Sequence, residues 1–256
     1  MDKRFLTPRE VIDATINLGI KKAKLKVSSC ILLGILAGFF IGFGGLGNIL
    51  VTQTLDGIDT GLARLAGAAV FPVGLMLVVM CGAELFTGNN LMTLAFMNKK
   101  ISLCEILKSW SIVYLANFVG SVVLALCIFY AGTLTGDAAN KAISIAESKT
   151  ALTTLELIIR GILCNIIVTL AVWMATASQD VISKIFACWF PIMLFVLCGF
   201  EHSVANMFFI PMGMLLEANV TMCQLMTNLI FVTIGNIIGG GILVPIVYNK
   251  VFIKNE

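Results

Sequence analysis

An acid, an imidazole and an amide lie close together in a stretch that is otherwise apolar. After Phe190-Pro191 the chain reads Cys198-Gly199-Phe200-Glu201-His202-Ser203-Val204-Ala205-Asn206. Polar groups inside a bilayer are costly unless they face a cavity or have partners, so they indicate a functional site. His202 is the only histidine in the sequence, and because imidazole titrates near neutral pH, one proton changes its charge. The chemistry indicated is therefore the handling of a small solute, with His202 on a pore; the alternative is a histidine packed for structure alone.

The same pattern occurs once more, 117 residues earlier. After Phe71-Pro72 the chain reads Cys81-Gly82-Ala83-Glu84-Leu85-Phe86-Thr87-Gly88-Asn89, so that Glu84 corresponds to Glu201 and Asn89 to Asn206. Interruptions at matching places in two halves of a membrane chain predict a solute pathway between the halves.

Each polar residue of these segments has two interpretations. Glu84 and Glu201 either relay protons or accept hydrogen bonds from backbone N–H groups that a broken helix leaves free; because the placement is symmetric, we favour the structural role, with Asn89 and Asn206 as further structural polar residues at the breaks. Thr87 either offers its hydroxyl to the pore or bonds back to its own helix. We favour the pore, because half-helix N-termini direct N–H groups and positive dipole toward anions.

The surrounding elements are transmembrane helices. The 256 residues are 59% hydrophobic and 12% charged, which excludes a soluble domain. A hydrocarbon core of ~30 Å needs about 20 apolar residues as helix, and the uncharged blocks fit six spans, with the second and fifth each broken in two. Block length and the lack of sustained alternation argue against an outer-membrane barrel. The predicted fold class is an all-α membrane protein.

The two halves resemble each other beyond the breaks. Gly34-Ile35-Leu36 matches Gly161-Ile162-Leu163, and residues 116–120 match residues 235–239. Since each half holds three spans, the copies must be inverted relative to each other. We expect an N-terminal segment at 1–26, repeats at 27–132 and 151–250 separated by a polar extracellular loop at 133–150, and a cytoplasmic tail at 251–256.

Basic residues predict the orientation. With six spans, one side carries thirteen lysines and arginines and the other four, so both termini lie in the cytoplasm. The richer side holds Lys3, Arg4, Arg9, Lys21, Lys22, Lys24, Lys26, Lys99, Lys100, Lys108, Lys184, Lys250 and Lys254. The stretch Pro8–Lys26 predicts a basic amphipathic helix on the membrane surface, with Pro8 at its first position; it is not a cleavable signal.

Other ligands and partners are excluded by composition. The eight cysteines form no C-x-x-C pair, and with one histidine no metal site is expected. The net charge of +3 reflects the inner-face asymmetry, so no nucleic-acid partner is expected, and no cofactor is predicted.

The motifs resemble those of the formate/nitrite transporter family. The residues that carry the resemblance are Thr87-Gly88-Asn89, the run from Gly199 to Phe208 and the segment Thr233-Ile234-Gly235-Asn236-Ile237-Ile238-Gly239-Gly240. The resemblance covers nearly the whole chain. It implies an aquaporin-like fold, a homopentamer with one pore per protomer in the bacterial cytoplasmic (inner) membrane, and transport of formate, nitrite or hydrosulfide rather than an enzymatic reaction.

The resemblance also implies roles for individual residues. It places His202 and Thr87 at the centre of the pore, with Lys149, Asn165 and Asn236 as further pore residues. It assigns the narrow apolar rings to Leu75, Leu85 and Phe195. Each has a plainer alternative: Asn165 and Asn236 as interhelical hydrogen bonds, Lys149 as a solvated lysine, and the three apolar side chains as ordinary packing. A further asparagine, Asn117, is expected to be interhelical.

The mechanism that follows is a channel in which the anion reaches Thr87 and His202 and crosses the rings as the protonated acid. In the competing version His202 stays a neutral donor and the anion crosses unprotonated. A neutral-solute channel of the aquaporin type is the main rival, although the chain lacks paired Asn-Pro-Ala loops. An ammonium channel or an intramembrane enzyme would need groups that a single histidine does not supply.

Overall fold

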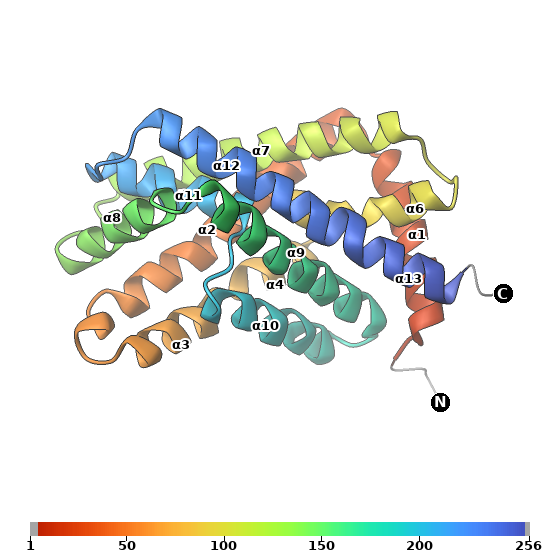
Figure 1. The fold of residues 1–256 in the computed structure, drawn as a ribbon, viewed down its shortest axis with the longest axis horizontal. Coiled ribbons are helices and arrows are strands. Elements are labelled where there is room, and N and C mark those ends of the chain that lie inside the picture. Colours follow the sequence, from red (N-terminus) through yellow and green to blue (C-terminus); the bar gives the residue numbers. More distant parts are fainter. Residues whose placement is uncertain (1–4, 254–256) are drawn as a thin grey trace.

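The computed structural model describes residues 5–253 and is helical throughout that range, apart from one isolated β-bridge between Phe5 and Ser178. The helices form one bundle, elongated along the direction of the long helices, with α8 at one end and α1 at the other (Figure 1). The first half contains α1 (Pro8–Ala23), α2 (Val27–Thr52), η1 (Leu55–Gly57), α3 (Thr60–Val70), α4 (Val73–Cys81), α5 (Phe86–Asn89), η2 (Asn90–Met92), α6 (Thr93–Met97) and α7 (Leu103–Tyr130). The second contains α8 (Asp137–Thr150), α9 (Thr154–Ala177), α10 (Val181–Leu197), α11 (Ser203–Leu215), α12 (Met222–Asn236), η3 (Ile237–Leu243) and α13 (Val244–Phe252).

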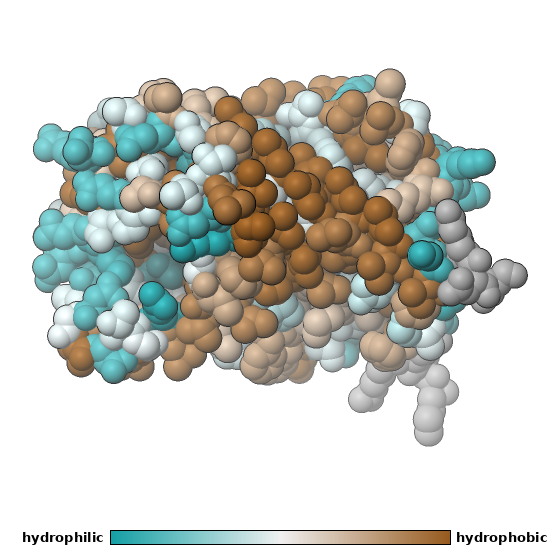
Figure 2. Space-filling model, in the orientation of Figure 1, coloured by the Kyte–Doolittle hydropathy of each residue, from teal (hydrophilic) through white to brown (hydrophobic). Residues whose placement is uncertain are grey.

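Apolar residues cover the middle of the molecule, and hydrophilic ones gather toward the end that carries α8 (Figure 2). Five helical segments among the described residues are long and apolar enough to cross a membrane: Val27–Gly57, Thr60–Cys81, Leu103–Tyr130, Thr154–Ala177 and Met222–Phe252. Two shorter apolar helices, Val181–Leu197 and Ser203–Leu215, follow the fourth. The predicted all-α membrane class is confirmed.

Both predicted helix breaks are present. Helix α4 ends at Cys81 and α5 begins at Phe86, while α10 ends at Leu197 and α11 begins at Ser203. Gly82 and Gly199 follow the ends of α4 and α10 with φ angles of 78° and 69°. A Cβ at either glycine would meet nothing within 4 Å. Glycine is needed there for its left-handed backbone, which turns the chain out of the helix, and not for space.

Glycines also set the packing of two helix pairs next to the breaks. A Cβ on Gly120 of α7 would collide with the carbonyl oxygen of Ile35 in α2, and a Cβ on Gly239 would collide with that of Ile162 in α9. Each pair therefore packs backbone against backbone, as small residues permit in membranes. The internal match between the halves thus extends to the packing of α2 with α7 and of α9 with α12–η3.

Two segments differ from the sequence expectations. Most of the predicted polar loop at 133–150 is the helix α8, whose small residues Ala138, Ala142 and Ala146 are buried. The N-terminal helix forms as predicted, but its apolar face packs on protein. Val11, Ile12 and Ile16 join one buried cluster with residues of η2 and α6, because these short elements leave an apolar surface that α1 covers. Lys3, Arg4, Lys254 and the rest of 1–4 and 254–256 lie outside the described residues.

The last span contains a turn type absent from its counterpart. Helix α7 runs unbroken for 28 residues, whereas α12 passes into the seven-residue π-helix η3 before α13. The π-helix includes Gly239, Gly240 and Gly241, and Pro245 follows at the start of α13. Proline has no N–H, so it cannot supply a regular i→i−4 bond there, and π turns are found mostly as short interruptions of this kind.

Candidate functional site

Two asparagines hold the helix breaks by the same three hydrogen bonds. The Asn117 side chain accepts from the Phe86 N–H at 3.0 Å and donates to the carbonyl oxygens of Gly34 at 2.8 Å and Glu84 at 2.9 Å. Asn236 accepts from the Ser203 N–H at 3.0 Å. It donates to the carbonyl oxygens at positions 161 and 201, at 2.8 and 3.0 Å. Two of the three backbone groups that each amide binds belong to the break, which would otherwise leave them unpaired in an apolar interior. The third lies within α2 or α9, so the amide also ties the break to that helix.

The break carboxylates are likewise partnered in the same way. Glu84 accepts from the Asn89 Nδ2 at 2.7 Å and from the Lys22 Nζ at 2.6 Å. Glu201 accepts from the Asn206 Nδ2 at 2.6 Å and from the Lys149 Nζ at 3.0 Å to both oxygens. The lysines come from α1 and α8, outside the two breaks. The expectation that these carboxylates accept from backbone N–H groups is wrong: their donors are the ammonium and amide groups of side chains. Such partners are what a buried charge requires.

The histidine and the threonine meet across the two breaks. His202 lies at the N-cap of α11, where its Nδ1 accepts the Ala205 N–H at 3.1 Å. Its Nε2 lies 2.8 Å from the Thr87 Oγ1 of α5. Both side chains are at least 97% buried. Because Nδ1 is an acceptor here, a neutral ring carries its proton on Nε2 and donates it to Thr87.

Two cavities enter the molecule from opposite ends. The α8-side cavity, of about 200 Å³, is lined by Asn48, Thr52, Asp56, Ala63, Arg64, Phe71, Lys141, Ile145, Lys149, Phe195, Val196, Gly199, Phe200, Glu201, His202, Ala205 and Phe209. The α1-side cavity, of about 450 Å³, is lined by Leu18, Lys21, Lys22, Leu25, Leu75, Val78, Val79, Gly82, Ala83, Glu84, Leu85, Gly88, Asn89, Val172, Ala175, Thr176 and Lys184.

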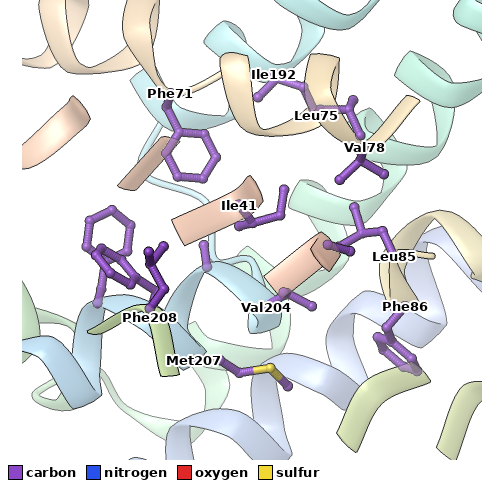
Figure 3. Close-up of a cluster of buried hydrophobic side chains, with 14 of the residues drawn as sticks. Ile41, Phe71, Leu75, Val78, Leu85, Phe86, Ile192, Val204, Met207 and Phe208 are labelled. Atoms are coloured by element: carbon purple, nitrogen blue, oxygen red, sulfur yellow. The ribbon is translucent and has the colours of Figure 1, made fainter. Parts of the chain in front are cut away.

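A narrow apolar space, the central collar, lies between them. Its volume is about 10 Å³ and its walls are Ile41, Phe71, Leu75, Leu85, Val168, Ile192, Phe195 and His202. Phe71, Phe195 and His202 also line the α8-side cavity, and Leu75 and Leu85 also line the α1-side cavity. Figure 3 shows Ile41, Phe71, Leu75 and Leu85 gathered in the buried cluster around this space. A space of this size holds at most about one water molecule.

Aromatic rings form the α8-side rim of the collar. The Phe195 and His202 rings stack with centroids 5.9 Å apart. The edge of Phe71 packs against Phe195, and its face stacks on Phe209 at 6.2 Å. The Lys149 Nζ lies 5.5 Å from the Phe209 ring centroid. His202 is thus the only polar side chain in the collar, and it is fixed by stacking as well as by hydrogen bonds.

The predicted site residues fall into two groups. His202, Lys149, Phe195, Leu75 and Leu85 line the cavities or the collar, as do Glu84, Glu201 and Asn89. Asn165, Asn206, Asn236 and Thr87 line none of these three spaces. Thr87 lies behind His202, in contact with its Nε2.

Asn165 belongs to the interhelical network. Its Nδ2 donates to the Asn90 Oδ1 and to the Asn236 carbonyl oxygen, each at 2.8 Å. That carbonyl oxygen lies at the junction of α12 with the π-helix, where regular helical pairing changes. Asn165 and Asn236 thus occupy the interhelical positions that were their plainer alternative.

Sequence reasoning missed several residues of the site. Lys22 was counted only as a surface charge, and Phe71 and Phe209 only as apolar residues. Asn228, which accepts from the Asn206 Nδ2 at 2.7 Å and donates to the Lys149 carbonyl oxygen at 2.9 Å, was not singled out. An amide inside an apolar span was the signal available for Asn228. Nothing in the local sequence ties Lys22 to Glu84, which is 62 residues away.

Metal ligands do not gather anywhere in the described part of the chain. Within residues 5–253 no group of three or more His, Cys, Asp or Glu side chains could hold a metal ion. The arrangement is instead two cavities from opposite ends and, between them, a collar with one imidazole in its wall.

The chain is similar to known channels over nearly its full length. The sequence model of the formate/nitrite transporter family matches residues 9–249. The uncharacterized transporter YrhG of Bacillus subtilis is 41% identical, with 98% of this chain and 96% of that one covered. The formate channel BtFdhC of Bacillus thuringiensis is 40% identical, with 98% of each covered. A solved pentameric formate channel with formate bound superimposes with a TM-score of 0.80 at 30% identity, covering 88% of this chain and 97% of that one.

These relatives are channels and transporters, so the expectation that the chain is not an enzyme is confirmed. The matched range includes both helix breaks and both lysines that hold them. The chain belongs to the formate/nitrite transporter family.

Proposed function

We propose that this chain is a channel for small monovalent anions of weak acids, namely formate, nitrite or hydrosulfide, with His202 and Thr87 at its central site. The observation that carries the proposal is the collar: two cavities from opposite ends share its walls, and its one polar side chain is His202. Family membership and relatives named as formate channels support the substrate class.

The size and polarity of the collar favour crossing as the neutral acid. Removing an ion from water costs several kcal/mol even after relaxation, and seven of the eight collar residues are apolar. A protonated weak acid loses far less hydration. We therefore propose that the anion takes up a proton at the collar and crosses as formic, nitrous or hydrosulfuric acid.

The hydrogen bonds at His202 favour the bulk solution, and not the ring, as the source of that proton. With Nδ1 engaged by the Ala205 N–H, the neutral ring donates through Nε2 to Thr87. Thr87 lines neither cavity nor the collar and holds the ring from behind, so an arriving anion meets the His202 ring itself. Giving up the Nε2 proton would leave an imidazolate, so the proton comes from the bulk solution and is relayed through water in the cavity, which leaves no hydroxide behind. His202, held in place by Thr87, is the polar wall at which the anion takes up this proton.

The assembly and orientation are part of the same proposal. The solved relative is pentameric, and we propose a homopentamer with one pore in each protomer. The excess of basic residues near α1 and α13 favours both termini in the cytoplasm, and the membrane is then the bacterial inner membrane. The repeats are proposed to be inverted, since the equivalent groups Lys22–Glu84 and Lys149–Glu201 line cavities at opposite ends.

The test is to measure formate uptake and internal pH together in proteoliposomes. The proposal predicts that one proton accompanies each formate and that uptake carries no current. Thr87→Val, which removes the hydroxyl at nearly constant shape, should lower uptake by up to about tenfold, because it removes the hydrogen bond that holds the His202 ring at Nε2, worth about 0.5–1.5 kcal/mol. Uptake that carries current without proton movement would contradict passage as the acid. If none of the three anions is taken up, the proposed function is wrong.

A further inference from the structure

Positive side chains outnumber negative ones in the lining of the α8-side cavity. Its ionisable side chains, apart from His202, are three cations and two carboxylates, namely Arg64, Lys141, Lys149, Asp56 and Glu201. Family resemblance directs attention to Lys149 as the group that attracts an anion. The contacts assign that task elsewhere.

Two of the three cations are already neutralised. The Lys149 Nζ lies 3.0 Å from both carboxylate oxygens of Glu201, with side chains that are 17% and 5% exposed. Lys141 forms an ion pair with Asp56. Seen by an approaching anion, each pair is a dipole whose field falls off faster than that of a free charge.

Arg64 is the cation that remains. It lies on α3 with an exposed side chain that lines the same cavity. No hydrogen bond or ion pair joins its guanidinium to another group in the described part of the chain. It therefore contributes the net charge of the cavity that leads to His202.

We propose that Arg64 is the receiving group for the anion at the α8-side mouth, a role that rests on the proposed function. A planar guanidinium presents parallel N–H donors that match a two-oxygen anion. Formate and nitrite have that geometry, whereas hydrosulfide offers one atom and gains only the charge. Arg64 thus raises the local concentration of the anion and favours two-oxygen anions over hydrosulfide.

The α1-side cavity differs in this respect. Its cations are Lys21, Lys22 and Lys184 against the single carboxylate Glu84, and Lys22 is the one paired with Glu84. The remaining charges there are ammonium groups, which lack the planar fork. We therefore expect preference for two-oxygen anions to arise at the α8 side.

The experiment is a concentration series of formate and hydrosulfide uptake in proteoliposomes, at low and high salt, for the wild type and four variants. In Arg64→Gln the half-saturating formate concentration should rise about threefold at low salt, with little change in maximal uptake, because one screened charge is lost. The rise should shrink at high salt. In Arg64→Lys the half-saturating concentration of formate should rise about twofold, while that of hydrosulfide keeps its wild-type value.

Asp56→Asn tests the same charge argument by adding free positive charge to the cavity instead of removing it. Removing Asp56 releases Lys141 and adds a second free cation, so the half-saturating concentration should fall at low salt. The matched control is Arg160→Gln, a cation of α9 that pairs with Glu156 and does not line the cavity; it should behave as the wild type.

The outcomes separate this inference from the function itself. If Arg64→Gln matches the wild type while the wild type takes up formate, or if Asp56→Asn raises the half-saturating concentration, the role of Arg64 is wrong and the channel function stands. If Arg64→Lys raises the half-saturating concentrations of formate and hydrosulfide equally, Arg64 does not favour two-oxygen anions and that part of the inference is wrong. If the wild type takes up none of the anions, the proposed function is wrong.

Discussion

The two helix breaks are built on the same scaffold and differ in the residues that face each other. Each has a left-handed glycine, a glutamate clamped by an asparagine five residues later, an asparagine from the last helix of its half, and a lysine from outside. The residues that meet at the centre differ between the two breaks. His202 of the second break corresponds to Leu85 of the first, and Thr87 of the first to Val204 of the second.

This difference separates architecture from chemistry. What both breaks share turns the chain and pairs the backbone groups and buried charges of the break in an apolar interior, and it is present in both halves. The polar pair is assembled once, with one partner from each break. A channel with identical breaks would have either two apolar faces or two histidines at the collar, so the proposed single solute site depends on the loss of symmetry at these two positions.

Breaking the ion pairs should produce the largest losses of stability in the series, and the loss should differ between the two halves of the chain. Lys149→Met leaves Glu201 as a buried unpaired carboxylate, which typically costs about 3–5 kcal/mol. Lys22→Met should cost less, because the Lys22 and Glu84 side chains are 27% and 10% exposed, against 17% and 5% for the other pair. Denaturant unfolding in detergent measures both.

The double variant Lys149→Met with Glu201→Gln supplies the control, since it removes both charges and should recover much of the loss. Equal destabilisation by Lys22→Met and Lys149→Met would show that the difference in burial does not matter.

Replacing Asn117 or Asn236 should cost less stability than breaking an ion pair, and the two replacements should cost the same. Asn117→Ala and Asn236→Ala each leave one buried N–H and one carbonyl oxygen of the break without a partner, for about 3 kcal/mol. Thermal unfolding of both variants checks the equality. If Asn236→Ala changed uptake and left stability intact, Asn236 would act on the solute, as its family role implies, and the structural equivalence would be wrong.

The glycines after α4 and α10 should give the smallest effects of the series. Alanine at Gly82 or Gly199 forces an L-residue into left-handed backbone at a cost of about 1–2 kcal/mol, without a clash, since nothing lies within 4 Å of the added Cβ. Gly199→Asn should cost less than Gly199→Ala, because asparagine tolerates this conformation better. Alanine variants as stable as the wild type would contradict the assignment of these glycines to backbone shape.

The sequence predicted the parts of this fold that depend on local pattern. Apolar block lengths gave the spans, and Glu84 and Glu201 inside them marked both breaks. It failed where long-range contacts decide. Residues 133–150 were polar enough to be predicted as a loop, yet alanines at 138, 142 and 146 follow a helical spacing that buries them against the bundle.

The candidate site shows the same division. His202 and Thr87 could be singled out as polar residues at helix breaks, but their contact across 115 residues could not. Lys149 lines a cavity, whereas its neutralisation by Glu201 could not be read without the fold. Asn236 and Asn117 occupy matching sequence positions, and only their hydrogen bonds show that both serve the backbone.

The most direct test of the central claim is weak-acid uptake by His202→Asn across a pH series. Asparagine is a favoured N-cap residue, so it can replace the Nδ1 bond to the Ala205 N–H while removing the imidazole from the collar. With folding and assembly verified, formate uptake should fall about tenfold or more, while the remaining uptake still moves one proton with each formate. A variant that folds, assembles and takes up formate at the wild-type rate would contradict the central role of His202.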